Sequence, residues 1–184
     1  LNSPETLVFQ KGTNLYGLNF AIKSKMQERY FIIVEGYMEK WDSSLLKDAH
    51  TPIENVIDTL EASVIYLNHN LKTIEGDLHI AAMRGEEASK RVRPGDIVII
   101  GGDRDDAVNS MIDAEVSLII LTGSLGVEAE VLNKLKEKGI SVISTSFNTY
   151  LTSQQIIQAI PVEYIMQKGD LKLFSTDDTL DHVK

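Results

Sequence analysis

The fold of this chain is decided by residues 95–146, which read GDIVIIGGDRDDAVNSMIDAEVSLIILTGSLGVEAEVLNKLKEKGISVISTS. This stretch contains three short apolar runs rich in Ile and Val, at 97–100, 118–121 and 140–143, separated by two segments of helical length. Such runs are typical of buried parallel strands, and the intervals between them are typical of crossover helices. The sequence therefore predicts an α/β fold with a mainly parallel sheet.

The unusual residues of this stretch lie in two loops that directly follow the first two predicted strands. The loops read GGDRDD (101–106) and LTGS (121–124). Open parallel sheets bind ligands at the carboxyl ends of their strands. The two loops therefore supply the candidate ligand or dimer-contact residues, which are Gly102, Asp103, Arg104, Thr122, Gly123 and Ser124.

Each loop has a functional and a structural interpretation. In the functional interpretation, the glycines allow the backbone to approach a ligand closely, and Arg104 binds a carboxylate or phosphate group of that ligand. In the structural one, Asp103 caps a helix over 105–113, and Arg104 pairs with an acid within the fold or across a dimer. Three carboxylates repel an anion, which favours the structural or dimer role. LTGS lacks the lysine of a P-loop, so we expect Gly123 to form a turn and Ser124 to cap the following helix.

The flanking segments add further elements. A helix is predicted after Thr51 and Pro52, with Glu54 completing a capping box. Another is predicted after Thr152, whose box partner is Gln155. The remaining expectations are strands at 62–67 and 76–83, a short helix at 86–92, helix ends at Gly139 and Pro161, and an N-terminal helix and strand at 15–22 and 31–34.

Composition excludes several classes of protein. The 184 residues contain no Cys, so disulfides and thiolate metal sites are absent, and no apolar run approaches the ~20 residues of a membrane span. A net charge of −9 opposes binding to nucleic acid. We expect a cytoplasmic protein without membrane contact. The chain begins without Met and stops inside a predicted helix, which is expected of a fragment.

The four blocks LNSPET, KG, LYGLNFA and IIVEGYM occur in this order within residues 1–39. They resemble the segment of bacterial DNA primases that enters the Toprim catalytic fold. The resemblance implies that Glu35 stands at the position of the first catalytic acid. Asp103 and Asp105 have the spacing of the Asp-x-Asp pair that such a site needs, but Arg104 separates them and the following glycine is missing. The favoured prediction is that the chain has no metal site. A metal site made of Glu35, Asp103 and Asp105 is the weaker alternative. The scattered histidines are expected at the surface or at an edge: His50, His69, His79 and His182.

A second set of motifs runs from Lys40 to the end. Asp103-Arg104 matches a DR element, and Thr122-Gly123-Ser124 stands where TGG is usual. YMEKWDSSLL with TPIENVIDTL resembles the exit from one CBS motif, and VEYIM with LKLFSTDDTLDHVK resembles the opening of the next. Together they resemble the regulatory insert of CBS-containing family II inorganic pyrophosphatases, which places a DRTGG domain between two CBS motifs. The implied division is a primase-like segment at 1–39, a connector at 40–61, a DRTGG domain at 62–161 and the start of a CBS motif at 162–184.

This resemblance implies a non-catalytic regulatory and dimerisation module that couples adenine-nucleotide sensing to a pyrophosphatase domain with no counterpart in the sequence. The expected partners are a second copy and that catalytic domain, and no intrinsic cofactor is expected. Binding of adenine nucleotide is expected only where the CBS pair is complete. Thr176, Asp177 and Asp178 are either remnants of its nucleotide contacts or simply the start of a helix. The alternatives are a DNA primase fragment and a small-anion or nucleotide-binding domain. The two resemblances meet near Gly36, so a further hypothesis is that residues 1–39 are an artificial join.

Overall fold

The computed structural model describes residues 43–81, 85–101, 104–124, 126–161 and 163–164. The predicted N-terminal helix and strand, and most of the expected start of a CBS motif, lie outside the described residues. Within the described ranges, no helix is both long enough and apolar enough to cross a membrane.

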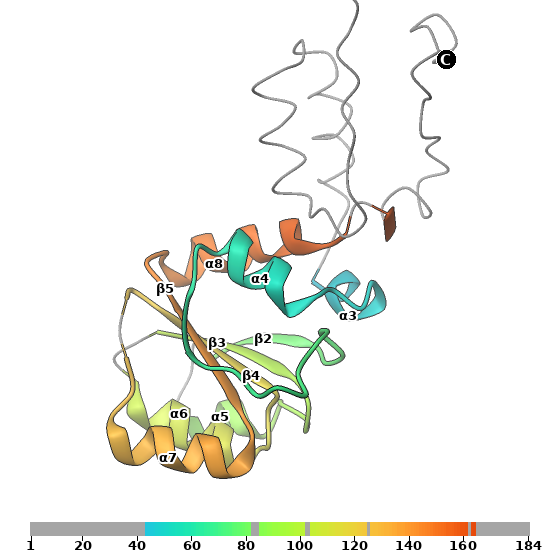
Figure 1. The fold of residues 1–184 in the computed structure, drawn as a ribbon. Coiled ribbons are helices and arrows are strands. Elements are labelled where there is room, and N and C mark those ends of the chain that lie inside the picture. Colours follow the sequence, from blue (N-terminus) through green and yellow to red (C-terminus); the bar gives the residue numbers. More distant parts are fainter. Residues whose placement is uncertain (1–42, 82–84, 102–103, 125, 162, 165–184) are drawn as a thin grey trace, which may run out of the picture.

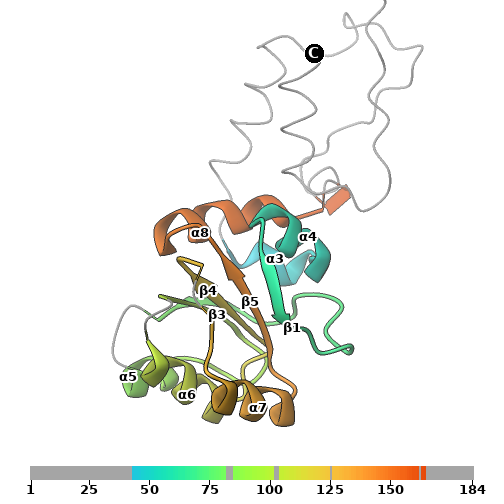
Figure 2. The same ribbon diagram turned by 60° about the vertical axis from the view of Figure 1, so that its left-hand side comes forward.

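The centre of the fold is a five-stranded sheet in the order β1-β5-β4-β3-β2 (Figure 1). Strands β2 to β5 are parallel, which confirms the predicted mainly parallel α/β sheet. The fifth strand, β1, pairs antiparallel with β5 at one edge (Figure 2). The strands are β1 (Ser63–Tyr66), β2 (Leu78–Ile80), β3 (Ile97–Gly101), β4 (Leu118–Thr122) and β5 (Ser141–Thr145).

Helices cover both faces of the sheet (Figure 1). One layer consists of α5 (Gly85–Ser89), α6 (Asp105–Asp113) and α7 (Ala129–Lys138), the three crossover helices of the parallel strands. The other layer consists of α3 (Leu45–Asp48), α4 (Ile53–Thr59), α8 (Thr149–Gln155) and the 3-10 helix η1 (Ile156–Ala159).

Side chains along each central strand point alternately to the two faces of the sheet, so they contribute to two hydrophobic cores, one on each face. In β3, Ile97 and Ile99 pack under the α4 layer, whereas Val98 and Ile100 pack under the α6 layer. All four side chains are completely buried. A strand buried on both faces must be apolar at every position, which is why this run lacks polar alternation.

Two helix starts differ from the predicted capping boxes. Pro52, rather than Thr51, occupies the N-cap position of α4, and no side chain caps this helix. Helix α8 begins one turn before the predicted start, because the side chain of Asn148 accepts a hydrogen bond from the Leu151 amide (2.8 Å). The Thr152 hydroxyl instead donates to the carbonyl of Asn148 (2.9 Å), so it lies inside the helix.

One of the loop caps was also predicted wrongly, and another lies outside the described residues. Arg104 occupies the N-cap position of α6 without a side-chain capping hydrogen bond, and the capping role expected for Asp103 stays a prediction. Glu128 occupies the N-cap position of α7, so Ser124 does not cap it. The span of α6 matches the prediction, and Gly139 ends α7 in the left-handed conformation (φ +69°), as expected.

Candidate functional site

The two predicted loops do meet at one end of the sheet. Gly101 lies beside Thr122, and Thr122 lies beside Thr145, so the carboxyl ends of β3, β4 and β5 are level with one another. Arg104, Thr122, Gly123 and Ser124 are therefore brought to the same end of the fold. Gly102 and Asp103 lie outside the described residues, and their predicted roles stay predictions.

Arg104 is used to hold two connections together. Its Nη1 donates a hydrogen bond to the carbonyl of Ala81 (3.1 Å), at the end of β2, and its Nη2 donates to Asp106 Oδ2 (3.3 Å). Asp106 Oδ2 also accepts from the amide of Gly85 (3.3 Å). The hydrogen bond from Arg104, followed by that from Gly85, lowers the pKa of Asp106 below its ordinary value. These contacts agree with the structural interpretation, in which Arg104 pairs with an acid within the fold.

The Thr122–Ser124 loop extends the sheet. The amide of Gly123 donates to the carbonyl of Phe147 (3.1 Å), and the amide of Ser124 donates to that of Thr145 (2.9 Å). A phosphate cradle needs free backbone amides that converge on the anion. Because both amides donate to carbonyls, this loop is not built as a phosphate cradle. Gly123 (φ +82°) forms the expected turn, and Ser124 (φ +59°) continues it in the left-handed region.

Two buried hydroxyls connect these loops to the α4 and α8 layer. Thr122 Oγ1 lies 3.1 Å from the hydroxyl of Thr149, the first residue of α8. Thr145 Oγ1 donates to the carbonyl of Leu60 (2.7 Å), directly after α4. Buried hydroxyls are retained where they are hydrogen-bonded. The threonines thus join the strand ends to the helices on that face of the sheet.

Sheet topology also disfavours a ligand crevice at this end. Ligands in open α/β sheets bind where the strand order reverses and helices diverge to opposite faces. Here β2, β3, β4 and β5 follow one another across the sheet in a single direction, and α5, α6 and α7 lie on one face (Figure 2). The parallel part of the sheet therefore has no switch point.

A polar cluster that sequence reasoning missed lies at the opposite end of the sheet. Asp96 is only 4% exposed, and its carboxylate accepts hydrogen bonds from the amides of Asp77 (2.9 Å) and Arg93 (2.8 Å). His79 Nε2 lies 2.8 Å from the same carboxylate, on the edge strand β2. The acid followed a Pro-Gly turn in the sequence and resembled an ordinary surface residue, so only the fold identifies it as buried.

Lys47 of α3 binds this end of the sheet through Asp77 (2.5 Å). Hydrogen bonding to Lys47 lowers the pKa of Asp77, and the same contact raises the pKa of Lys47. Both side chains are about one third exposed or more, so water screens the pair. The contact positions α3 against the loop before β2.

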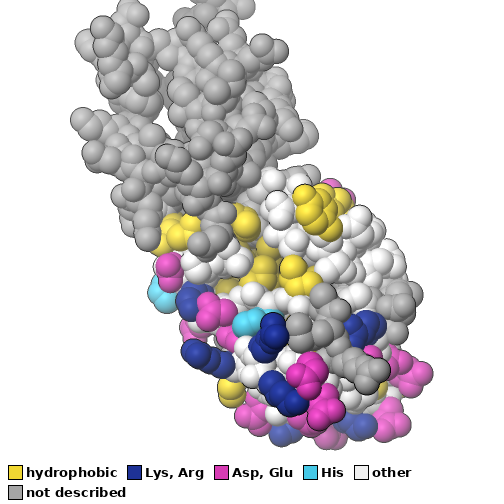
Figure 3. All heavy atoms as spheres, turned by 180° about the vertical axis from the view of Figure 1, so that it is seen from behind, with side chains coloured by type: hydrophobic (Ala, Val, Ile, Leu, Met, Phe, Trp, Pro, Cys, Tyr) yellow, Lys and Arg dark blue, Asp and Glu magenta, His cyan; other side chains and the backbone are white. Residues whose placement is uncertain are grey.

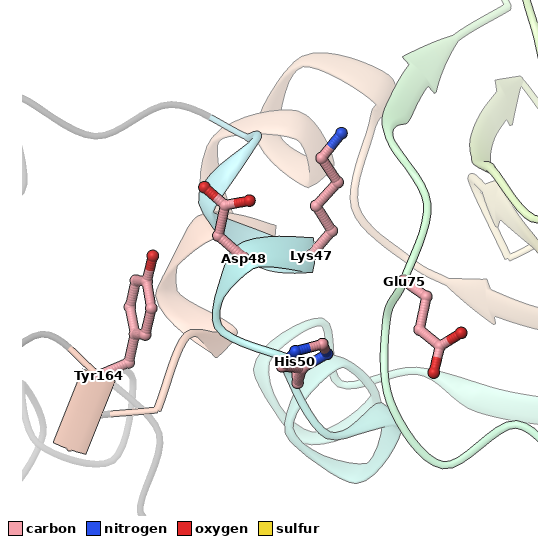
Figure 4. Close-up of a pocket in the computed structure, with 5 residues that line it drawn as sticks. All are labelled: Lys47, Asp48, His50, Glu75 and Tyr164. Atoms are coloured by element: carbon pink, nitrogen blue, oxygen red, sulfur yellow. The ribbon is translucent and has the colours of Figure 1, made fainter.

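An open depression beside α3 is lined by Lys47, Asp48, His50, Glu75 and Tyr164 (Figure 4). Their polar ends point in different directions and do not converge on one point. Within the described ranges, no three His, Asp or Glu side chains are grouped as metal ligands. Asp105 is exposed on α6, whereas Glu35 and Asp103 lie outside the described residues, as do Thr176, Asp177 and Asp178.

Comparisons with known protein families and with solved structures both identify a DRTGG domain. A model described as "DRTGG domain" matches residues 55–159. The crystal structure of the CBS and DRTGG domains of the regulatory region of Clostridium perfringens pyrophosphatase, complexed with the activator diadenosine tetraphosphate, is 28% identical and gives a TM-score of 0.81. That match covers 100% of this chain and 86% of the other.

Similar full-length proteins fall into two groups. A cobalt-dependent inorganic pyrophosphatase of Clostridium perfringens is 36% identical over 152 residues, covering 83% of this chain and 28% of that protein. A probable manganese-dependent inorganic pyrophosphatase of Thermotoga maritima is 28% identical over 133 residues, covering 72% and 24%. A DNA primase of Clostridium acetobutylicum is 67% identical over 39 residues, covering 21% and 6%. The chain thus spans about a quarter of the length of the pyrophosphatases that it matches.

Proposed function

The chain belongs to the DRTGG domain family, and from that membership we propose that it is a non-catalytic regulatory and dimerisation module of an inorganic pyrophosphatase. In this proposal it transmits an adenine-nucleotide state to a catalytic domain outside this sequence and works in the cytoplasm. The observation that carries the proposal is the match to the regulatory region of a pyrophosphatase that was crystallised with a dinucleotide activator.

The use of the DR and TGS residues supports a coupling role over a reaction centre. Arg104 joins the start of α6 to the end of β2, and Thr122 joins β4 to α8. Groups engaged in this way transmit displacement between elements. Among the described residues, no three His, Asp or Glu side chains are grouped as metal ligands.

The α3 and η1 layer is the proposed entry point for the nucleotide state. Leu46 of α3 and Tyr164, which lie near the two ends of the described part, both pack in the hydrophobic cluster of this layer. Figure 1 shows α3 and η1 on the same side of the sheet. The layer is tied internally, because Asn55 of α4 donates to the carbonyl of Ala159 (3.0 Å) in η1. A change in the spacing of flanking CBS motifs would therefore act on α3, α4 and η1 together. Nucleotide binding itself is assigned to a complete CBS pair, with Thr176, Asp177 and Asp178 on its nucleotide side.

A chimera tests the proposal. Residues 55–159 of this chain replace the matching DRTGG segment of the Clostridium perfringens pyrophosphatase, and pyrophosphate hydrolysis is measured with and without diadenosine tetraphosphate. We expect the chimera to remain nucleotide-responsive. A folded, active chimera whose rate no longer responds to the nucleotide would contradict the coupling role. The isolated chain is the matched control and is expected to hydrolyse no pyrophosphate with Co²⁺, Mn²⁺ or Mg²⁺.

A primase-type nucleotidyl transferase is the second candidate, favoured by the 67% identity over 39 residues to a DNA primase. It requires Glu35 to act with Asp103 and Asp105 around Mg²⁺. Primer synthesis by the chain on single-stranded DNA, abolished by Glu35→Gln, would establish it. We expect no synthesis from either form.

A further inference from the structure

The outer side of strand β2 is a free sheet edge among the described residues, because β2 pairs only with β3. The inner side is identified by two hydrogen bonds, from the amide of Ile97 to the carbonyl of Asp77 (2.9 Å) and from the amide of Ala81 to that of Ile99 (2.9 Å). Backbone groups of successive strand residues point to opposite sides. The peptide groups of Leu78 and Ile80 therefore point outward.

Side chains on both faces of this edge are suited to contact. Ile80 is 45% exposed on this edge strand. On the other face, a small groove of about 140 Å³ lies between β2 and α5, lined by His79, Ile80, Ala81, Ala88, Arg91, Val92 and Val98. Figure 3 shows the molecule from behind, with most of the exposed hydrophobic side chains in the upper half of the coloured part and the charged ones in the lower half.

We propose that β2 is the surface through which two copies of this chain associate, with the two β2 strands antiparallel and His79 at the two-fold axis. This inference rests on the dimerisation proposed above and specifies its surface. In that register Leu78 lies opposite Ile80 of the partner subunit, and Ile80 lies opposite Leu78 of the partner subunit. Each opposed pair exchanges two N–H···O=C hydrogen bonds, so all four outward peptide groups of each β2 strand are satisfied.

The symmetry of this edge favours a second copy over an unrelated peptide. In β2, the peptide groups of Leu78 and Ile80 point outward, and both residues are apolar. A two-fold axis at His79 therefore places each Leu78 opposite Ile80 of the partner subunit.

The opposite edge of the sheet is less suited to pairing. Strand β1 is irregular, because its register with β5 shifts between Val64 and Tyr66. Bulges of this kind protect edge strands from pairing with another chain. Val64 is nevertheless 49% exposed, so it provides a control of matched exposure for Ile80.

Sedimentation equilibrium of wild type, Ile80→Lys and Val64→Lys tests the surface, with circular dichroism to verify folding. We expect a wild-type dimer whose dissociation constant rises about 10-fold or more in Ile80→Lys and stays unchanged in Val64→Lys. A dimer unaffected by Ile80→Lys would overturn the β2 interface and leave the proposed dimerisation standing. A wild-type chain that stays monomeric at every concentration tested would overturn both.

Cross-linking provides a second readout that does not depend on weakening the dimer. The chain has no cysteine, so His79→Cys introduces a single thiol. Directly opposed residues at a non-hydrogen-bonded position have Cα atoms about 4.5 Å apart, which a disulfide can span. With oxidised glutathione as oxidant, we expect a covalent dimer from His79→Cys and none from Val64→Cys. The reverse result would assign the interface to β1 and overturn the proposal.

Discussion

The guanidinium group of Arg104 donates a hydrogen bond to the carbonyl oxygen of Ala81 across 3.1 Å. The contact joins the first residue before α6 to the residue directly after β2, although 23 positions separate them in the sequence. A carbonyl at the end of an edge strand has no neighbour in the ladder to satisfy it. Arg104 supplies that missing donor and, through Asp106, also fixes the start of α5.

Replacing Arg104 tests this connection. Arg104→Lys keeps the charge, but a single ammonium group cannot reproduce the planar fork that reaches both Ala81 and Asp106. We expect a loss of about 1 kcal/mol in the free energy of unfolding for Arg104→Lys, and about 2 kcal/mol for Arg104→Ala. Urea denaturation measures both, and hydrogen exchange of the Gly85 amide reports the local effect. Unchanged exchange at Gly85 in both variants would contradict the connection.

Ser124 stands where the family motif has a second glycine, and its φ of +59° is unfavourable for a residue with a Cβ atom. We expect Ser124→Gly to stabilise the chain by about 0.5 kcal/mol, since the relief of strain exceeds the added freedom of the unfolded chain. Gly123→Ala is the matched opposite change. It meets no neighbouring atom within 4 Å, so its expected loss of about 1 kcal/mol is purely conformational. Thermal unfolding distinguishes them, and destabilisation by Ser124→Gly would contradict this account.

The hydroxyl of Thr51 is completely buried and has no hydrogen-bond partner among the described residues. A buried polar group without a partner costs more than an apolar one of the same shape. Thr51→Val is therefore expected to raise the free energy of unfolding by about 1 kcal/mol. Thr152→Val is the control, because the buried Thr152 hydroxyl donates to Asn148, and a loss of about 1 kcal/mol is expected. Equal effects of the two changes would count against the difference in bonding.

The Lys47–Asp77 pair predicts a pH dependence of stability. The lowered pKa of Asp77 means that its contribution is present above the ordinary value of 3.8 and is lost as the pH falls through the folded-state value. The raised pKa of Lys47 has the opposite sense, with a contribution that is present below 10.5 and lost as the pH rises further. Lys47→Met removes both contributions.

Urea midpoints between about pH 5 and about pH 3 measure the acid side of this dependence. We expect Lys47→Met to lose less stability than wild type over that interval, so that the two curves converge on acidification. Lys136→Met, an exposed change on α7, is expected to run parallel to wild type. Parallel curves for Lys47→Met would show that the pair contributes nothing in solution.

Local sequence was sufficient where one physical requirement dominated. The central strands are buried on both faces, so apolar runs alone located β3, β4 and β5 to within two residues. Helix α7 ends at a residue in the left-handed backbone conformation, which glycine adopts most readily, so Gly139 marked this helix end in the sequence. The motif at Asp103-Arg104 and Thr122-Gly123-Ser124 likewise identified the family in advance of the fold.

Caps and buried polar groups were not determined in this way. Thr51, Ser124 and Thr152 each had a plausible capping position, but a helix start depends on which nearby side chain the tertiary fold leaves free to bond. Packing placed Thr51 in the core and made Asn148 the cap of α8. The sequence by itself thus determined the parallel α/β sheet and the family of this protein, because strand burial and motif residues are local properties. Only the tertiary structure decided that Asp96 is buried, that Arg104 bonds to Ala81 and that β2 has a single neighbouring strand among the described residues, because those depend on which distant backbone groups come together.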